Sequence, residues 1–238
     1  MSARRTGRLA QITIMAMLAG VGGCAPTANI EGEGQGELAR LAEAGQWREI
    51  AEKNVGCSSR TEACAKEHAI KGDACLRLVI QQPVSASVDD KDTRKLLDCA
   101  EDAYRRALEA SPSKSAPSRI SYHGGLLLTL SERRNRLDAR TKERKLDREN
   151  EKLLIAAQEA RREVPDSGLG YLYGASAYVY RASLNPEGRA RCNDLRQAEA
   201  LLKRSPPQSR QLVDEELRIS VLVKRELRES RCRSIRQL

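Results

Sequence analysis

The chain has 238 residues and a formal net charge of +9, and charged residues of both signs make up 32% of it. Only 3% of the residues are aromatic, and none is Phe. This composition excludes an aromatic-rich core and requires one built mainly from Leu, Ala, Ile and Val. Abundant Ala and Leu with few β-branched runs favour helices.

The N-terminal residues have the order of features found in a secretory signal. Three arginines precede an uncharged run from Leu9 to Val21, which is too short to span a bilayer as a helix. The sequence Val-Gly-Gly-Cys follows at 21–24. It resembles the lipobox of bacterial lipoprotein precursors. The resemblance implies that residues 1–23 are removed as a signal peptide, that the thiol of Cys24 receives diacylglycerol and that the new amino terminus is acylated.

Two alternatives remain for this segment. Residues 9–21 could form a buried helix with Cys24 as an ordinary core thiol, or the chain could be secreted without lipid after cleavage elsewhere.

If Cys24 is lipidated, the protein is anchored to a membrane rather than spanning it. Ala25 rather than Asp follows Cys24. By the same resemblance, this is compatible with an outer membrane and a domain that faces the periplasm.

Export also bears on the partners that the basic charge suggests. We expect no nucleic-acid partner, because an exported chain has little opportunity to meet one. Anionic lipid headgroups or acidic cell-wall polymers are better candidates for a partner recognised by charge. A solvated charged surface explains the composition without any partner.

The cysteines indicate disulfides. Six remain when Cys24 is set aside for lipid, an even number that an oxidising compartment would pair: Cys57, Cys64, Cys75, Cys99, Cys192 and Cys232. Six cysteines allow fifteen connectivities. Because four lie close together and two lie near the C-terminal end, we expect pairing within each group. The favoured pairs are Cys57–Cys64, Cys75–Cys99 and Cys192–Cys232.

A metal site is the alternative for part of this set. His68 follows Cys64 by four residues, one helical turn, so the two side chains could share a metal ion. However, no C-x-x-C occurs, His123 is remote in sequence, and no second closely spaced ligand pair completes a zinc pattern. We therefore assign no metal and no cofactor.

Beyond Cys24 the chain divides into a tether and a helical domain. Residues 25–36 are rich in Gly and in small or polar residues, which predicts a flexible tether. In residues 37–238 apolar residues recur at three- and four-residue steps, and no segment alternates with a period of two. Helices are expected from Glu37, from Trp47, from an N-cap at Thr61 or Ser59 to Gln81, from Thr93 to Ala110, from Ala116, from Glu149 to Glu163, from Gly168 to Leu184, from Pro186 to Ser205 and from Ser209.

Two charged segments are expected at the surface. Residues 132–151 are almost wholly charged, which predicts a protruding, solvated helix end and connection. The neighbouring carboxylates Asp89 and Asp90 are expected in an exposed loop, where solvent would leave their pKa values ordinary.

One segment resembles a known repeat. Ala100, Tyr104, Ala107 and Pro112 match the second helix of a tetratricopeptide repeat (TPR), in which small residues let the paired helices nest and the aromatic ring fills the gap between hairpins. The turn at 45–47 resembles the turn within such a repeat, although Ile50 replaces the small residue expected after it.

The other copies of the repeat are weaker. Ala160 with Pro165 and Leu201 with Pro206 keep only part of the pattern, and the spacing of these prolines departs from the family period of about 34 residues. The resemblance implies an all-α fold of antiparallel hairpins stacked as a degenerate TPR-like α-solenoid. An irregular helical bundle is the alternative.

No catalytic constellation is present in the sequence. It contains no G-x-S-x-G, no P-loop, no H-E-x-x-H and no Rossmann glycine pattern. A lone His at a helix start, such as His123, is more often a surface or capping residue than a base. We therefore expect a protein that is not an enzyme and assign no catalytic residue.

The tyrosines offer one possible binding face. Tyr171 and Tyr178 share a helix face, as do Tyr173 and Tyr180, and tyrosine is favoured at recognition surfaces. The alternative is that these rings fill the core of a chain without Phe.

The expected function is a membrane-anchored, non-catalytic scaffold that binds an envelope protein or peptide. The alternative is a small-solute-binding accessory lipoprotein of a transporter, in which the helices around Tyr171–Tyr180 enclose the solute.

Overall fold

The computed structural model describes residues 35–83, 86–114, 117–137, 143–185, 188–206, 210–230 and 232. Throughout these residues the regular structure is helical, without strands, so the expected all-α class is confirmed. The signal peptide, Cys24 and residues 25–34 of the tether lie outside the described residues. The helices are α1 Gln35–Glu43, α2 Trp47–Glu52, α3 Glu62–Gln81, α4 Lys91–Ala110, α5 Ser118–Asn135, α6 Glu143–Glu163, the 3₁₀ helix η1 Pro165–Ser167, α7 Leu169–Leu184, α8 Arg189–Arg204 and α9 Arg210–Glu229.

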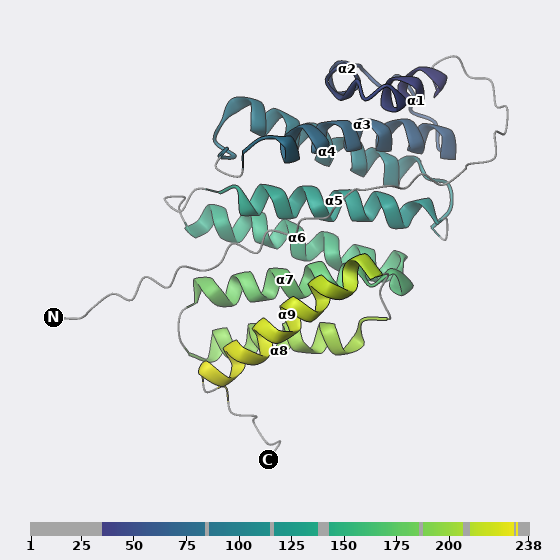
Figure 1. Cartoon of the computed structure of the whole chain (residues 1–238). Coiled ribbons are helices and arrows are strands. Elements are labelled where there is room, and N and C mark those ends of the chain that lie inside the picture. Colours follow the sequence, from purple (N-terminus) through teal and green to yellow (C-terminus); the bar gives the residue numbers. More distant parts are fainter. Residues whose placement is uncertain are drawn as a thin grey trace.

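The helices are stacked in chain order. Figure 1 shows α1 and α2 at one end, followed by the pairs α3–α4, α5–α6 and α7–α8, with α9 crossing the last pair obliquely. Each helix from α3 to α8 packs against the next one along the chain. Short connections make consecutive helices antiparallel neighbours. The result is an elongated array with a long lateral surface.

Local sequence sets several helix starts. Thr61 is the N-cap of α3, and its hydroxyl accepts a hydrogen bond from the Cys64 amide at 3.2 Å. Between α1 and α2, Gly45 adopts a φ of 70°, a left-handed conformation that favours glycine. The tight turn expected at residues 45–47 is therefore present.

The expectation of ordinary pKa values for Asp89 and Asp90 is wrong. Asp90 is the N-cap of α4, and its carboxylate accepts hydrogen bonds from the amides of Thr93 and Asp92, which lower its pKa. Asp89 accepts a hydrogen bond from Lys145 Nζ at 2.7 Å, and this contact with α6 lowers its pKa.

Seven of the described helices start at other residues than expected. The starts of α4, α5, α7 and α9 each lie within two residues of the expected position. The start of α1 at Gln35 takes in the last two residues assigned to the tether, and α8 starts at Arg189 rather than near Pro186. The largest difference is in α6, which starts at Glu143 rather than Glu149. Its added residues lack apolar periodicity, but Glu, Arg, Lys and Leu are strong helix formers. Intrinsic propensity therefore extends a helix that the hydrophobic pattern leaves unmarked.

Tyr104 lies at the centre of the core. It is buried between α3 and α5, where a Cβ added to Gly125 would lie 2.1 Å from the ring carbon Cζ and one added to Gly72 would lie 3.0 Å from it. Ala100 and Ala107, on the same helix, are fully buried. The ring therefore occupies the gap between neighbouring hairpins, the role that the repeat resemblance gives it.

Candidate functional site

Three disulfides cross-link the helical array. The bridges are Cys57–Cys64, Cys75–Cys99 and Cys192–Cys232, the pairs that the sequence favours. The first joins the segment before α3 to its first turn, the second joins α3 to α4, and the third joins α8 to Cys232, three residues past the end of α9. All six cysteines other than Cys24 are thereby paired.

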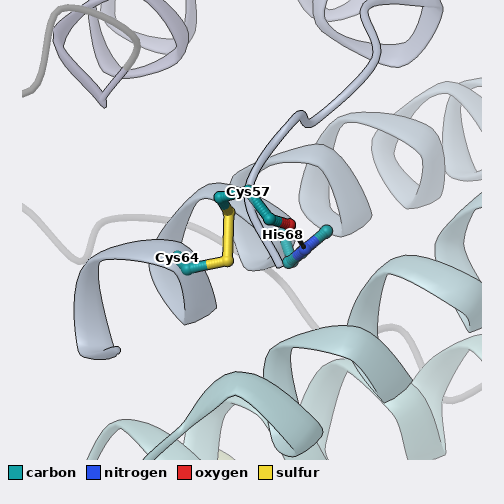
Figure 2. A group of neighbouring side chains, drawn as sticks. All are labelled: Cys57, Cys64 and His68. Atoms are coloured by element: carbon teal, nitrogen blue, oxygen red, sulfur yellow. Dashed lines mark hydrogen bonds between the residues drawn. A yellow bond between two sulfur atoms is a disulfide. The ribbon is translucent and has the colours of Figure 1, made fainter. Parts of the chain in front are cut away.

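The first disulfide lies beside His68. Figure 2 shows Cys57, Cys64 and His68 together at the start of α3, and their two sulfur atoms and a ring nitrogen lie within 4.8 Å of one another. The Nε2 atom of His68 lies 3.3 Å from the Cys57 carbonyl oxygen. Burial of the ring lowers the pKa of His68, and the contact with this carbonyl partly offsets that effect. The structure thus adds Cys57 to the Cys64–His68 pair that the sequence indicates.

A groove of about 490 Å³ opens at this cluster. Its other walls come from charged residues of α4 and from the segment before α3. Arg106 on this wall pairs with Asp102 at 2.8 Å, and Arg105 pairs with Glu101 at 3.1 Å. The lining residues are Cys57, Ser58, Arg60, Cys64, His68, Asp102, Arg105, Arg106, Glu109 and Ala110.

The four tyrosines of α7 separate into two environments. Tyr173 is buried in the central core, as the core-filling interpretation expects. The other three rings are half-buried, and each has a guanidinium near its face: Arg161 at 5.9 Å from Tyr171, Arg181 at 5.0 Å from Tyr178 and Arg134 at 4.7 Å from Tyr180. Among the described residues, none of the four tyrosines lines the groove beside Cys57–Cys64 or a second groove between the start of α6 and the end of α7.

The arginine over Tyr180 is the most unusual group in the core. The Arg134 side chain is almost completely buried, and its Nε and Nη2 atoms donate to Asn135 Oδ1 at 3.2 and 3.1 Å. Longer hydrogen bonds of 3.4 Å reach Asn150 on α6 and Ser176 on α7. Its described neighbours include no carboxylate within 4.0 Å. Burial lowers the pKa of Arg134 to about 10, which still leaves it charged at neutral pH.

The expectation that residues 132–151 are solvated is therefore wrong at the end of α5. Arg133 and Arg136 are buried as well as Arg134. Arg136 Nη2 donates to the Val79 carbonyl at 2.9 Å and Nη1 donates to the Pro83 carbonyl at 3.0 Å, so its guanidinium satisfies carbonyls at the end of α3. Arg133 pairs with Asp98 on α4 at 2.8 Å. Sequence periodicity could not reveal these partners, because they lie on other hairpins.

The interpretation of His123 as a surface or capping residue is also wrong. It is buried on α5, and its Nε2 atom lies 3.0 Å from Glu163 Oε2 at the end of α6. Arg119 contacts the same carboxylate and donates to the Leu108 carbonyl at 2.7 Å. Burial lowers the pKa of His123, partly offset by Glu163. Burial alone would raise the pKa of Glu163, but hydrogen bonds from Arg119 and His123 lower it.

A second groove, of about 470 Å³, lies between the start of α6 and the end of α7. Arg144 and Arg148, one helical turn apart, are exposed on its α6 wall and have no carboxylate within 4.0 Å among the described residues. On the other wall, Arg181 pairs with Asp194 at 2.7 Å and lies 3.9 Å from Glu151. The groove is lined by Arg144, Asp147, Arg148, Glu151, Arg181, Leu184 and Asn185. Two guanidinium groups are thus available to a carboxylate from outside.

Comparisons with protein-family models, with curated proteins and with solved structures found no match for this chain. In the described part of the chain, no helix has both the length and the apolar character needed to cross a membrane.

Proposed function

We propose that this chain is an exported, non-catalytic lipoprotein that is anchored through Cys24 and binds a carboxylate-bearing peptide segment of another envelope protein. The observation that carries the binding role is the groove between α6 and α7. Its exposed Arg144 and Arg148 lack acidic partners among the described residues. Guanidinium groups recognise carboxylates through paired hydrogen bonds, so an acidic segment is the ligand class that this wall suits.

The remaining groove residues limit what fits there. Asp147 and Glu151 lie on the same helix as the two arginines, and Leu184 adds an apolar contact from α7. A surface that mixes both signs with one aliphatic side chain suits an extended peptide better than a densely charged polymer. The elongated helical array adds lateral surface for further contacts (Figure 1).

Export is supported by the cysteines as well as by the lipobox resemblance. The three disulfides pair all the cysteines other than Cys24. Such use of cysteine is typical of oxidising compartments and rare in the cytoplasm.

Mass spectrometry of the membrane-extracted protein tests the anchor. We expect an acylated N-terminal Cys24 and release of the Cys24→Ser variant from the membrane. An unmodified Cys24 would contradict the anchoring part of the proposal.

Site-specific photocrosslinking in intact bacterial cells tests the binding role. A photoreactive residue replaces Leu184 in the groove, and a control replaces Ala44, which lies at the far end of the array. We expect an adduct with one identified envelope protein from position 184 only. The adduct should disappear in Arg144→Glu/Arg148→Glu.

The matched charge control is Lys91→Glu/Lys95→Glu, because these lysines form an exposed pair with the same spacing on α4. This variant should retain the adduct. Equal loss in both charge-reversal variants would show a nonspecific effect of charge and refute the assigned groove. If position 184 captures no protein while the purified chain binds a small solute, the transporter-accessory alternative replaces the scaffold.

A further inference from the structure

The Cys57–Cys64 disulfide and His68 carry an inference that is independent of the peptide-binding role. We propose that, when this disulfide is reduced, Cys57, Cys64 and His68 bind one zinc ion. The candidate ligand atoms of all three residues already lie within 4.8 Å of one another (Figure 2). Two thiolates and one imidazole are a ligand set that zinc prefers.

The backbone holds this ligand set in place. Cys64 and His68 are one turn apart on the same face of α3, and the Thr61 cap fixes the first turn of that helix. The Cα atoms of Cys57 and Cys64 are 5.7 Å apart. Tetrahedral zinc with Zn–S bonds of about 2.3 Å needs sulfur atoms roughly 3.8 Å apart. Side-chain rotation can supply this separation once the S–S bond is broken.

Solvent and reagents reach the cluster through the groove that Cys57, Cys64 and His68 line with Arg60. The same opening leaves room for water as a fourth zinc ligand, which a site with three protein ligands requires. Neither Cys75 nor Cys99 of the second bridge lines this groove. Cys57–Cys64 also closes the shortest loop of the three disulfides, with a sequence separation of 7. Its loss therefore removes the smallest chain constraint and leaves the fold to hold the ligands.

The chemistry needs a dithiol reductant. A thiolate of the reductant attacks one sulfur of the disulfide, the S–S bond breaks, and the second reductant thiol closes a new disulfide on the reductant. Cys57 and Cys64 thereby gain two electrons and two protons. Zinc then displaces both thiol protons to water and binds two thiolates and a neutral imidazole. The two thiolate charges balance the charge of the ion, which suits ligands as buried as Cys64 and His68.

Metal titration of the purified full chain tests the proposal, with Co²⁺ as the spectroscopic probe and Zn²⁺ as the competitor. Before reduction we expect no thiolate-to-cobalt charge-transfer absorption. After reduction we expect about one Co²⁺ per chain, displaced by about one Zn²⁺. His68→Gln should weaken Zn²⁺ binding by roughly tenfold or more, and Cys57→Ser should abolish the charge-transfer signal of this site. The Cys192→Ser/Cys232→Ser variant should keep both properties.

Circular dichroism of the reduced chain shows whether the ligands act within the folded array. A reduced chain that stays helical and binds no Zn²⁺ would refute the site. So would binding that is unchanged in His68→Gln and Cys57→Ser, since the metal would then be held by other thiols. A chain that unfolds on reduction and does not refold with Zn²⁺ would overturn the claim that the fold holds the ligands together.

Discussion

Gly125→Ala tests how tightly Tyr104 is packed between the hairpins. The new methyl group would lie 2.1 Å from Tyr104 Cζ and 2.2 Å from Cε1, much closer than ordinary contact. The ring cannot easily move away, because Gly72 closes its other side and its hydroxyl donates to Asp73 Oδ1 at 2.5 Å. Relief therefore requires separation of the helices or loss of that hydrogen bond.

The expected magnitude combines two opposing effects. Alanine in place of glycine inside a helix gains about 1 kcal/mol from propensity. Overpacking costs about 1–3 kcal/mol, and loss of the Tyr104–Asp73 hydrogen bond costs about 1–3 kcal/mol. We expect the free energy of unfolding to fall by about 2–4 kcal/mol. For a chain of this size, that corresponds to a drop in Tm of roughly 5–15 °C.

Gly124→Ala is the matched control on the same helix. Its methyl group would meet Leu169 Cδ1 at 3.4 Å, an ordinary contact, so this variant should be as stable as the parent or more stable by up to about 1 kcal/mol. Urea unfolding followed by far-ultraviolet circular dichroism measures both variants. In a double-mutant cycle, Tyr104→Leu should recover more than about 1 kcal/mol of the Gly125→Ala loss. If Gly125→Ala proves as stable as Gly124→Ala, the wedge role of Tyr104 is wrong.

Three further predictions follow from the buried polar groups and the disulfides. Asn150→Ala should lower the free energy of unfolding by about 1–3 kcal/mol, because Asn150 donates to the Ala177 carbonyl at 3.1 Å and accepts from Arg134. Glu151→Ala, at the exposed neighbouring position, should change it by no more than about 0.5 kcal/mol. Equal effects of the two variants in urea unfolding would contradict the role of these two hydrogen bonds. The pKa values of His68 and His123 are lowered in the folded chain, so the unfolded chain binds more protons near and below the ordinary value of 6.5. The free energy of unfolding should therefore be highest well above pH 6.5 and should fall as the solution is acidified. The chain has only these two histidines. Urea unfolding between about pH 7.5 and 5.5 should show this loss in the parent, a smaller loss in His123→Gln and none in His68→Gln/His123→Gln; a slope that persists in the double variant would assign it to other groups. Replacing Cys192 and Cys232 by Ala should lower the free energy of unfolding by about 1.5 kcal/mol more than replacing Cys57 and Cys64, because the two bridges close loops with sequence separations of 40 and 7. The reverse order in thermal unfolding would show that native contacts outweigh loop entropy.

Local patterns in the sequence predicted most of the helical framework. Apolar residues at helical spacing, the Thr61 cap and the Gly45 turn each act within one or two turns of chain, so their effects can be read without knowing the neighbours. The disulfide pairs were also favoured correctly, because each joins cysteines of one local group. The repeat resemblance implied that Tyr104 lies between hairpins, and the ring is buried between α3 and α5.

Burial of charge was decided only by the tertiary structure. Arg134 and Arg136 stand in a segment whose composition is that of a solvated surface, yet both are buried. Besides acceptors close in sequence, Arg134 reaches Asn150 on α6 and Arg136 reaches the Val79 carbonyl on α3. His123 and Glu163 are likewise 40 residues apart in the chain and meet only when α5 packs against α6. Cys57 joins His68 only because the segment before α3 folds back over its first turn. A sequence pattern specifies which face of a helix is apolar, but the free energy of burying a charge depends on partners that the packing of distant segments brings within hydrogen-bonding distance.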